Sequence, residues 1–248
     1  MSAPRRRPLL VAHGALGSAA QMQPIAEALG DGLSSLVSRV DVLEFPGHGQ
    51  SPLDDAEAFS LPQFVEVMAA ATARCETPPL LFGYSMGGYV ALALEARAPR
   101  TFAGIVTLGT KFDWDAASAE REAARLDPTL IAEKVPRFAA MLADRHARAG
   151  GWEGVLLRTA RLLRENGRAP LLSAEVLERI GVPVTVAVGG KDDTVSVDES
   201  RAAATMMLRA TCEVLDHMPH PIERVPMDQI IALCTALLAA GCTTPTSS

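Results

Sequence analysis

The chain has 248 residues, of which 48% are hydrophobic and 4% aromatic, and its formal net charge is -6. This length suits one α/β domain with an insertion, and aliphatic side chains must supply most of its core. The acidic balance argues against a nucleic-acid-binding protein, because such proteins usually carry a basic face.

The cysteines and the apolar runs argue against a metal site, a disulfide framework and a membrane protein. The 4 cysteines are scattered and form no C-x-x-C pair, so we expect reduced thiols. The apolar run after Arg5-Arg6-Arg7 is too short for an export signal, and no stretch reaches membrane-spanning length. We expect a cytoplasmic protein that needs no metal or other cofactor.

The first predicted strand covers residues 8–12 and ends in the turn His13-Gly14-Ala15. A helix then begins at Ser18 or Ala19. At the carboxyl edge of a sheet, the backbone N–H of Ala15 is placed to hold a negatively charged oxygen. We interpret His13 as a residue that fixes this loop rather than as a base.

A second predicted strand, residues 40–45, ends in the tight loop Pro46-Gly47-His48-Gly49. A histidine between two glycines could be catalytic. We interpret His48 instead as a turn residue that bonds to backbone. Helical spacing over residues 61–74 predicts the next helix.

The segment around Ser85 carries the strongest chemical signal of the sequence. A short apolar strand leads into Gly83-Tyr84-Ser85-Met86-Gly87, and a run of helix-forming residues follows. This strand–turn–helix context is typical of a nucleophile elbow, which exposes the serine hydroxyl above the sheet. Ser85 is therefore the candidate nucleophile. We expect the N–H groups of Ala15 and Met86 to stabilise the oxyanion.

After a strand over residues 102–108, the pattern becomes purely helical from Lys111 to Glu175. The helices predicted in and just after this segment cover residues 116–126, 130–147, 152–164 and 174–180. We interpret residues 111–175 as a helical cap over the catalytic edge, with residues 1–110 and 176–248 as the core. Apolar cap surface could also mediate a homodimer.

Two more strands are predicted over residues 182–188 and 211–215, followed by helices over 197–208 and 226–238. The residues from Gly241 to Ser248 read as a disordered tail. Strands and helices alternate along the chain, which predicts an α/β fold with a doubly wound, mainly parallel sheet. The loops after the last two strands hold Asp192 and His220.

Motifs along the chain, from Leu9 to Leu238, resemble those of the α/β-hydrolase superfamily, in particular a capped, esterase-like member with a serine nucleophile. The motifs are His13-Gly14, Pro46-Gly47-His48-Gly49, Gly83-x-Ser85-x-Gly87, Gly189-x-x-Asp192-x-x-Val195 and His220-x-x-Glu223. The resemblance implies Ser85 as nucleophile, Asp192 as acid and His220 as base. The family usually has an antiparallel hairpin before the His-Gly strand. Little chain precedes Leu9, so we expect about six strands.

Three other residues are alternatives for the same roles. Asp193 adjoins Asp192, and Asp113 follows an earlier strand, so each is an alternative acid. His217 is an alternative base, but it lies closer to the preceding strand than the family histidine does. The family spacing favours Asp192 and His220.

The leading hypothesis is a cofactor-free serine hydrolase that acts on a small-molecule ester or thioester through an acyl-enzyme. One alternative is a C–C bond hydrolase or a lyase on the same scaffold. Another is a binding module in which the cap holds a ligand. No nucleic acid and no membrane is expected as a partner.

Overall fold

A computed structural model of the chain describes residues 6–52 and 59–241. Its centre is a six-stranded sheet in the order β2-β1-β3-β4-β5-β6, and every neighbouring pair is parallel. The predicted α/β class, with a doubly wound parallel sheet of about six strands, is confirmed. The strands are β1 (Arg7–Ala12), β2 (Val37–Leu43), β3 (Leu80–Tyr84), β4 (Gly104–Leu108), β5 (Val184–Gly189) and β6 (Ala210–Leu215).

The three strands β3, β4 and β5 are buried along their whole length. Strands covered on both faces read as continuous apolar runs, which is why the sequence reveals them clearly. The edge strand β2 begins at Val37 rather than at the predicted Val40, because the exposed Ser38 and Arg39 hide its start in the sequence pattern.

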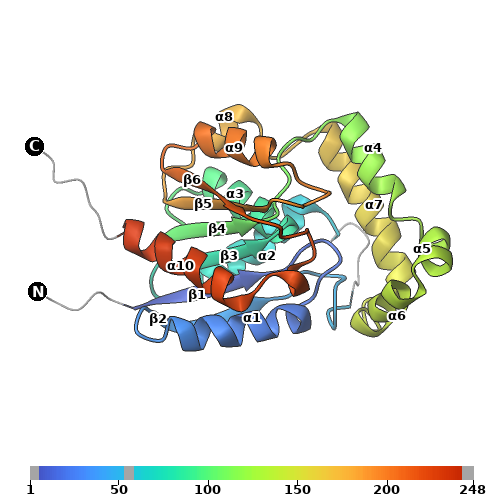
Figure 1. The fold of residues 1–248 in the computed structure, drawn as a ribbon, viewed down its shortest axis with the longest axis horizontal. Coiled ribbons are helices and arrows are strands. Elements are labelled where there is room, and N and C mark those ends of the chain that lie inside the picture. Colours follow the sequence, from blue (N-terminus) through green and yellow to red (C-terminus); the bar gives the residue numbers. More distant parts are fainter. Residues whose placement is uncertain (1–5, 53–58, 242–248) are drawn as a thin grey trace, which may run out of the picture.

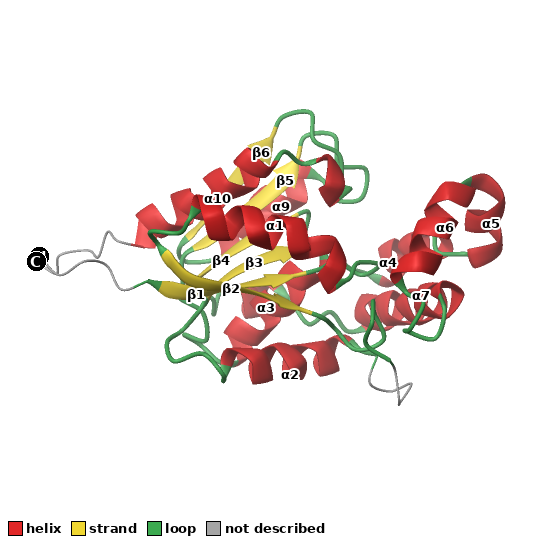
Figure 2. Cartoon of the chain, turned by 90° about the horizontal axis from the view of Figure 1, so that it is seen from below, coloured by secondary structure: helices red, strands yellow, loops and turns green. Residues whose placement is uncertain are grey.

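Helices cover both faces of the sheet (Figure 2). One face packs against α1 (Ala19–Gly32) and α10 (Met227–Gly241), and the short helix η2 (Ile222–Arg224) precedes α10. The opposite face packs against four helices. They are α2 (Leu61–Thr72), α3 (Met86–Arg97), α8 (Ala174–Leu177) and α9 (Val197–Met206). The tail predicted after Gly241 lies outside the described residues.

Four further helices lie between β4 and α8 in the chain and stand beyond the carboxyl ends of the strands (Figure 1). They are α4 (Ala116–Ala124), α5 (Pro128–Lys134), α6 (Pro136–Arg145) and α7 (Trp152–Arg168). We call α4 to α7 with their connecting loops the helical insertion. It contains its own small apolar cluster, which includes Ile131, Leu142 and Leu156.

The single helix predicted over residues 130–147 is wrong: the structure has α5 and α6 in its place. The break is at Val135, whose φ of -136° and ψ of 58° are not helical. Pro136 causes it, because proline disfavours helical backbone at the preceding residue and has no N–H to continue a helix. The chain therefore turns between two short helices, which pack on each other and on α7.

Candidate active site

Ser85 lies between β3 and α3 with φ 50° and ψ -116°, in the left-handed range that residues other than glycine rarely adopt. The bond from its N–H to Leu108 O, 2.8 Å, holds this strained turn against the neighbouring strand. A Cβ atom at Gly83 would lie 2.5 Å from Gly88 N, and one at Gly87 would lie 2.6 Å from Ala12 O. Only glycine allows strand and helix to approach this closely.

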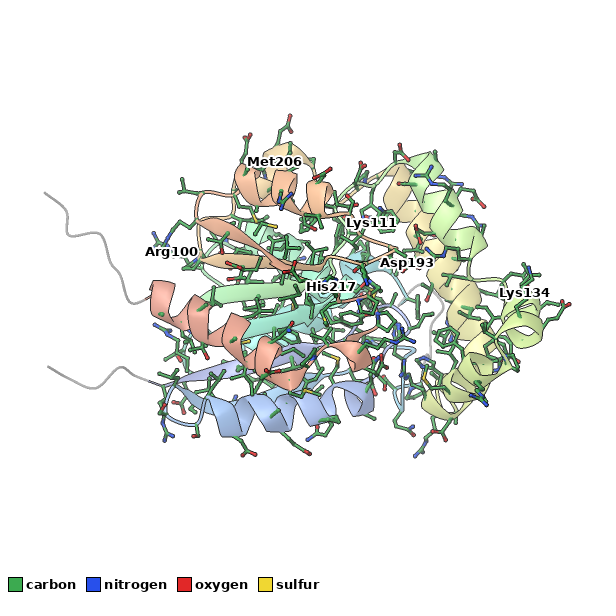
Figure 3. All side chains as sticks on the ribbon, viewed as in Figure 1. Arg100, Lys111, Lys134, Asp193, Met206 and His217 are labelled. Carbon is green, nitrogen blue, oxygen red and sulfur yellow. The ribbon has the colours of Figure 1, made fainter. Side chains whose placement is uncertain are left out.

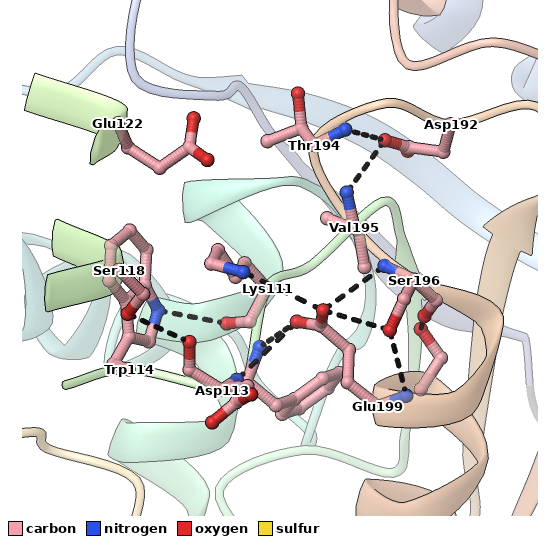
Figure 4. Close-up of polar contacts among 12 residues, drawn as sticks. Lys111, Asp113, Trp114, Ser118, Glu122, Asp192, Thr194, Val195, Ser196 and Glu199 are labelled. Atoms are coloured by element: carbon pink, nitrogen blue, oxygen red, sulfur yellow. Dashed lines mark hydrogen bonds and ion pairs between the residues drawn. The ribbon is translucent and has the colours of Figure 1, made fainter. Parts of the chain in front are cut away.

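Asp192 follows β5, and its carboxylate is almost completely buried, with 1% of the side chain exposed. One oxygen, Oδ1, accepts the N–H groups of Thr194 and Val195, each at 2.8 Å (Figure 4). The other, Oδ2, lies 2.7 Å from His220 Nδ1. Because a carboxylate only accepts, the proton between them belongs to His220 Nδ1, which leaves Nε2 free to accept a proton.

The alternative acids and the alternative base lie elsewhere. Asp193 is 72% exposed and faces Arg125 of the helical insertion at 3.3 Å (Figure 3). Asp113 is exposed, and its N–H points to the Glu199 carboxylate (Figure 4). His217 is exposed in a turn with φ 63°. The structure brings Asp192 and His220 together and leaves these three apart.

A cavity of about 740 Å³ lies between the sheet edge and the helical insertion, and its walls include Ser85, His220, Ala15 and Met86. The candidate nucleophile, the candidate base and both candidate oxyanion donors therefore share one space. Most of the lining is apolar. These side chains include Leu16, Leu61, Tyr84, Tyr89, Trp114, Leu126, Ile131, Val135, Phe138, Met141, Leu162 and Leu163.

His13 and His48 fix loops, as the sequence predicts. His13 is fully buried: its Nε2 accepts Phe45 N–H at 3.1 Å, and its Nδ1–H donates to Gly14 O at 2.8 Å. His48 Nε2–H donates to Ala15 O at 2.7 Å. Burial lowers the pKa of His48 to about 4, and burial with the nearby His48 lowers the pKa of His13 well below its usual value. Both imidazoles are therefore neutral near pH 7.

Two residues at the site were not identified from the sequence. Gly109 follows β4 with φ 64°, and a Cβ atom there would lie 3.2 Å from the His220 ring and 3.4 Å from Asp192 Oδ2. It leaves room for the histidine–carboxylate pair. Tyr84 donates its hydroxyl to His220 O at 3.0 Å and so anchors the histidine loop. Both act through contacts distant in sequence, so local patterns carry no signal for them.

Nothing in the described residues gathers three or more side chains able to hold a metal ion. Within the same residues, no helix combines the length and apolar character that crossing a membrane requires.

Residues 9–233 match the sequence model of the Alpha/beta hydrolase family. The chain belongs to this family. The match begins within β1 and covers the other five strands and the helical insertion, so it includes every loop that carries a candidate site residue.

Two curated relatives match shorter segments. The biotin biosynthesis bifunctional protein BioHC of Cellvibrio japonicus is 36% identical over 103 residues, which are 41% of this chain and 18% of that protein. The pimeloyl-[acyl-carrier protein] methyl ester esterase of Neisseria meningitidis is 41% identical over 61 residues, 24% of this chain and 22% of that one. The matched segments thus span under a quarter of each relative.

Solved structures share the fold over nearly the whole chain. NosK from Streptomyces actuosus superposes with a TM-score of 0.77 at 21% identity, covering 96% of this chain and 100% of that one. At this level of identity, the likeness shows that the two chains share a fold and does not identify a substrate for this chain.

Proposed function

We propose that the chain is a serine hydrolase that cleaves a small ester or thioester through Ser85, His220 and Asp192. The observation that carries the proposal is the 2.7 Å bond between His220 Nδ1 and Asp192 Oδ2, beside a cavity that His220 shares with Ser85. The proposed chemistry uses side chains and backbone alone and needs no cofactor.

In the proposed mechanism, His220 Nε2 takes the proton of the Ser85 hydroxyl, and the serine oxygen attacks the acyl carbon. Asp192 stabilises the imidazolium that forms, and its own bonds to two backbone N–H groups keep it aligned. His220 then gives the proton to the departing alcohol or thiol. Water repeats the cycle on the acyl-enzyme and releases the acid.

The tetrahedral oxyanion would be held by the N–H groups of Ala15 and Met86. Met86 is the first residue of α3, so its N–H has no partner within the helix and lies at the positive end of the helix dipole. The Ala15 N–H belongs to the turn after β1, whose carbonyl groups are fixed by His13 and His48.

The lining of the cavity favours an acyl group with an aliphatic chain. We propose that residues 111–175 act as the cap that the sequence predicts, since helices within this range supply much of the apolar wall. The name of the Neisseria relative, a methyl ester esterase, supports an ester rather than an amide substrate. A cytoplasmic location remains part of this proposal.

The test is Ser85→Ala, assayed with p-nitrophenyl acetate and butyrate. We expect hydrolysis to disappear and labelling by a fluorophosphonate to be lost, because both need the serine oxygen. Ser38→Ala, on the exposed edge strand β2, is the matched control and should keep both. Retained activity in Ser85→Ala would contradict the proposal.

Other outcomes would select the alternatives. A fluorophosphonate label on Ser85 without turnover of any ester in an acyl-chain and leaving-group panel would favour C–C bond hydrolysis or a lyase step. Failure of all serine-directed probes, with tight ligand binding in the cavity, would favour a binding module.

A further inference from the structure

The C-terminal end of α6 reaches from the helical insertion into the loops of the core. His146, the residue that ends α6, is fully buried. Its Nδ1 accepts Gly49 N–H at 3.0 Å, and its Nε2–H donates to Leu16 O at 3.1 Å. Burial lowers its pKa to about 4, so the ring is neutral near pH 7 and each nitrogen has one fixed role.

Arg145, the neighbouring residue, bonds to the same carbonyl. One guanidinium nitrogen donates to Leu16 O at 2.8 Å, and another lies 3.2 Å from Glu223 Oε1. Glu223 lies just after His220 in the chain, and its Oε1 also accepts a hydrogen bond from Gln21 Nε2 at 2.7 Å. The pair Arg145–His146 therefore joins the loop after β1 to the loop after β2 and to the segment after His220.

The loop after β1 carries Ala15, a proposed oxyanion donor, and histidine side chains fix its first carbonyl groups. His13 holds Gly14 O, and His48 holds Ala15 O. In a trans peptide the C=O and N–H point in opposite directions, so fixing Gly14 O also fixes the direction of Ala15 N–H. Leu16 O is the next carbonyl along, and its two side-chain donors come from the helical insertion.

We propose that Arg145 and His146 are positioning residues for Ala15, so that the oxyanion hole is complete only when the helical insertion is docked on the core. This inference rests on the proposed function and extends it: the insertion would set the rate of the chemical step in addition to shaping the cavity. A small displacement of a donor weakens its bond to the oxyanion, and loss of one such donor typically costs on the order of a hundredfold in rate or more.

The two bonds of His146 can be separated by substitution. In His146→Gln the amide nitrogen can replace Nε2 as donor to Leu16 O, whereas in His146→Asn the amide oxygen can replace Nδ1 as acceptor for Gly49 N–H. His146→Phe removes both. We expect kcat of His146→Gln to stay within about threefold of wild type, and kcat of His146→Asn and His146→Phe to fall by roughly tenfold to a hundredfold, with KM little changed.

A second readout separates positioning from general disruption. A trifluoromethyl ketone forms a tetrahedral adduct with the serine, whereas an ether analogue of the ester occupies the cavity without reacting. We expect affinity for the ketone to fall by the same factor as kcat/KM, while affinity for the ether stays constant. Arg164→Gln breaks the ion pair with Glu120 that joins α4 and α7, away from the cavity lining, and is the matched control with wild-type kcat.

His146→Phe with wild-type kcat and ketone affinity would overturn this inference and leave the proposed function intact. An equal loss of ketone and ether affinity would also overturn it, because the insertion would then act on binding alone. A wild-type protein that forms no ketone adduct would instead count against the proposed function. If His146→Phe does not fold, the comparison of His146→Gln with His146→Asn carries the same test.

Discussion

The surroundings of the Asp192 side chain hold it in one orientation. Two backbone N–H groups and the His220 ring bond to it, and almost no solvent reaches it. In Asp192→Asn the amide oxygen can keep the two backbone bonds, which turns the NH₂ group toward His220 Nδ1. That nitrogen must then accept, so the proton moves to Nε2 and the ring can no longer take the serine proton.

We therefore expect Asp192→Asn to lower kcat for p-nitrophenyl esters by on the order of a thousandfold or more, with the thermal melting temperature little changed. Asp193→Asn is the matched variant, since its carboxylate is exposed and bonds only to Arg125 among the described residues. The kcat of Asp193→Asn should fall far less than that of Asp192→Asn. Equal losses in the two variants would remove Asp192 from the proposed role.

Residue spacing in the sequence distinguishes Asp192 from Asp193 and His220 from His217, and the structure brings the favoured two side chains together. Their roles stay predictions until the variants are assayed. The sequence could not reveal Gly109 or Tyr84, because each contacts the histidine loop from a distant strand. Short motifs encode local backbone geometry well, while supporting contacts depend on the assembled fold.

At the scale of elements, the core strands were easier to predict than the helical insertion. The dipeptide Asn166-Gly167 resembles a helix end, yet both residues lie inside α7. Asn166 Oδ1 accepts the Tyr89 hydroxyl at 3.0 Å, and a Cβ atom at Gly167 would lie 2.3 Å from Ala119 of α4. Tertiary packing here overrides turn propensity, because the glycine is needed for the close approach of two helices.

The helices α5 and α6 present apolar side chains both to the cavity and to solvent. Val135, Phe138 and Met141 line the cavity while remaining 47%, 36% and 37% exposed. A long acyl chain that follows this wall would cover them, which adds favourable burial that a short chain cannot reach. These exposed apolar side chains should therefore favour esters with long acyl chains over esters with short ones.

We expect Phe138→Ala to lower kcat/KM for p-nitrophenyl octanoate by about tenfold and to leave the value for the acetate nearly unchanged. Leu157→Ala is the matched control: it removes an exposed leucine of α7 that is absent from the cavity lining. A uniform loss for both esters in Phe138→Ala would place the acyl chain elsewhere in the cavity.

Across the whole molecule, three buried histidines link the core loops to the helical insertion. His13 and His48 have ring centroids 5.0 Å apart, and those of His48 and His146 are 6.0 Å apart. Burial lowers the pKa of each, with the cations Arg145 and Arg158 adding to the effect at His146. His13 and His146 each accept a backbone N–H, from Phe45 and Gly49, so protonation of either ring breaks a contact between separate parts of the chain. Both nitrogens of His48 face carbonyl oxygens, so its burial is what opposes protonation.

The folded-state pKa values of these histidines lie below the unfolded value of 6.5, so below about pH 6.5 the unfolded chain binds protons that the folded chain does not. The stability that the neutral histidines contribute is therefore fully present well above about pH 6.5 and is lost as the pH falls from there toward their folded-state pKa values. Each histidine contributes a slope that approaches about 1.4 kcal/mol per pH unit at the acid end. We expect the free energy of unfolding in urea to fall steadily from about pH 7.5 to 5.5, above the range where most carboxylates titrate.

Substitution identifies the source of this slope. His146→Gln removes one titrating group while keeping a bond to Leu16 O, so the slope should become shallower even if stability at pH 7.5 changes little. His217→Asn removes an exposed histidine from a turn whose positive φ asparagine tolerates, and should leave the slope as in wild type. If His146→Gln retains the wild-type slope, His146 does not contribute to it, and the acid sensitivity must come from His13, His48 or carboxylates instead.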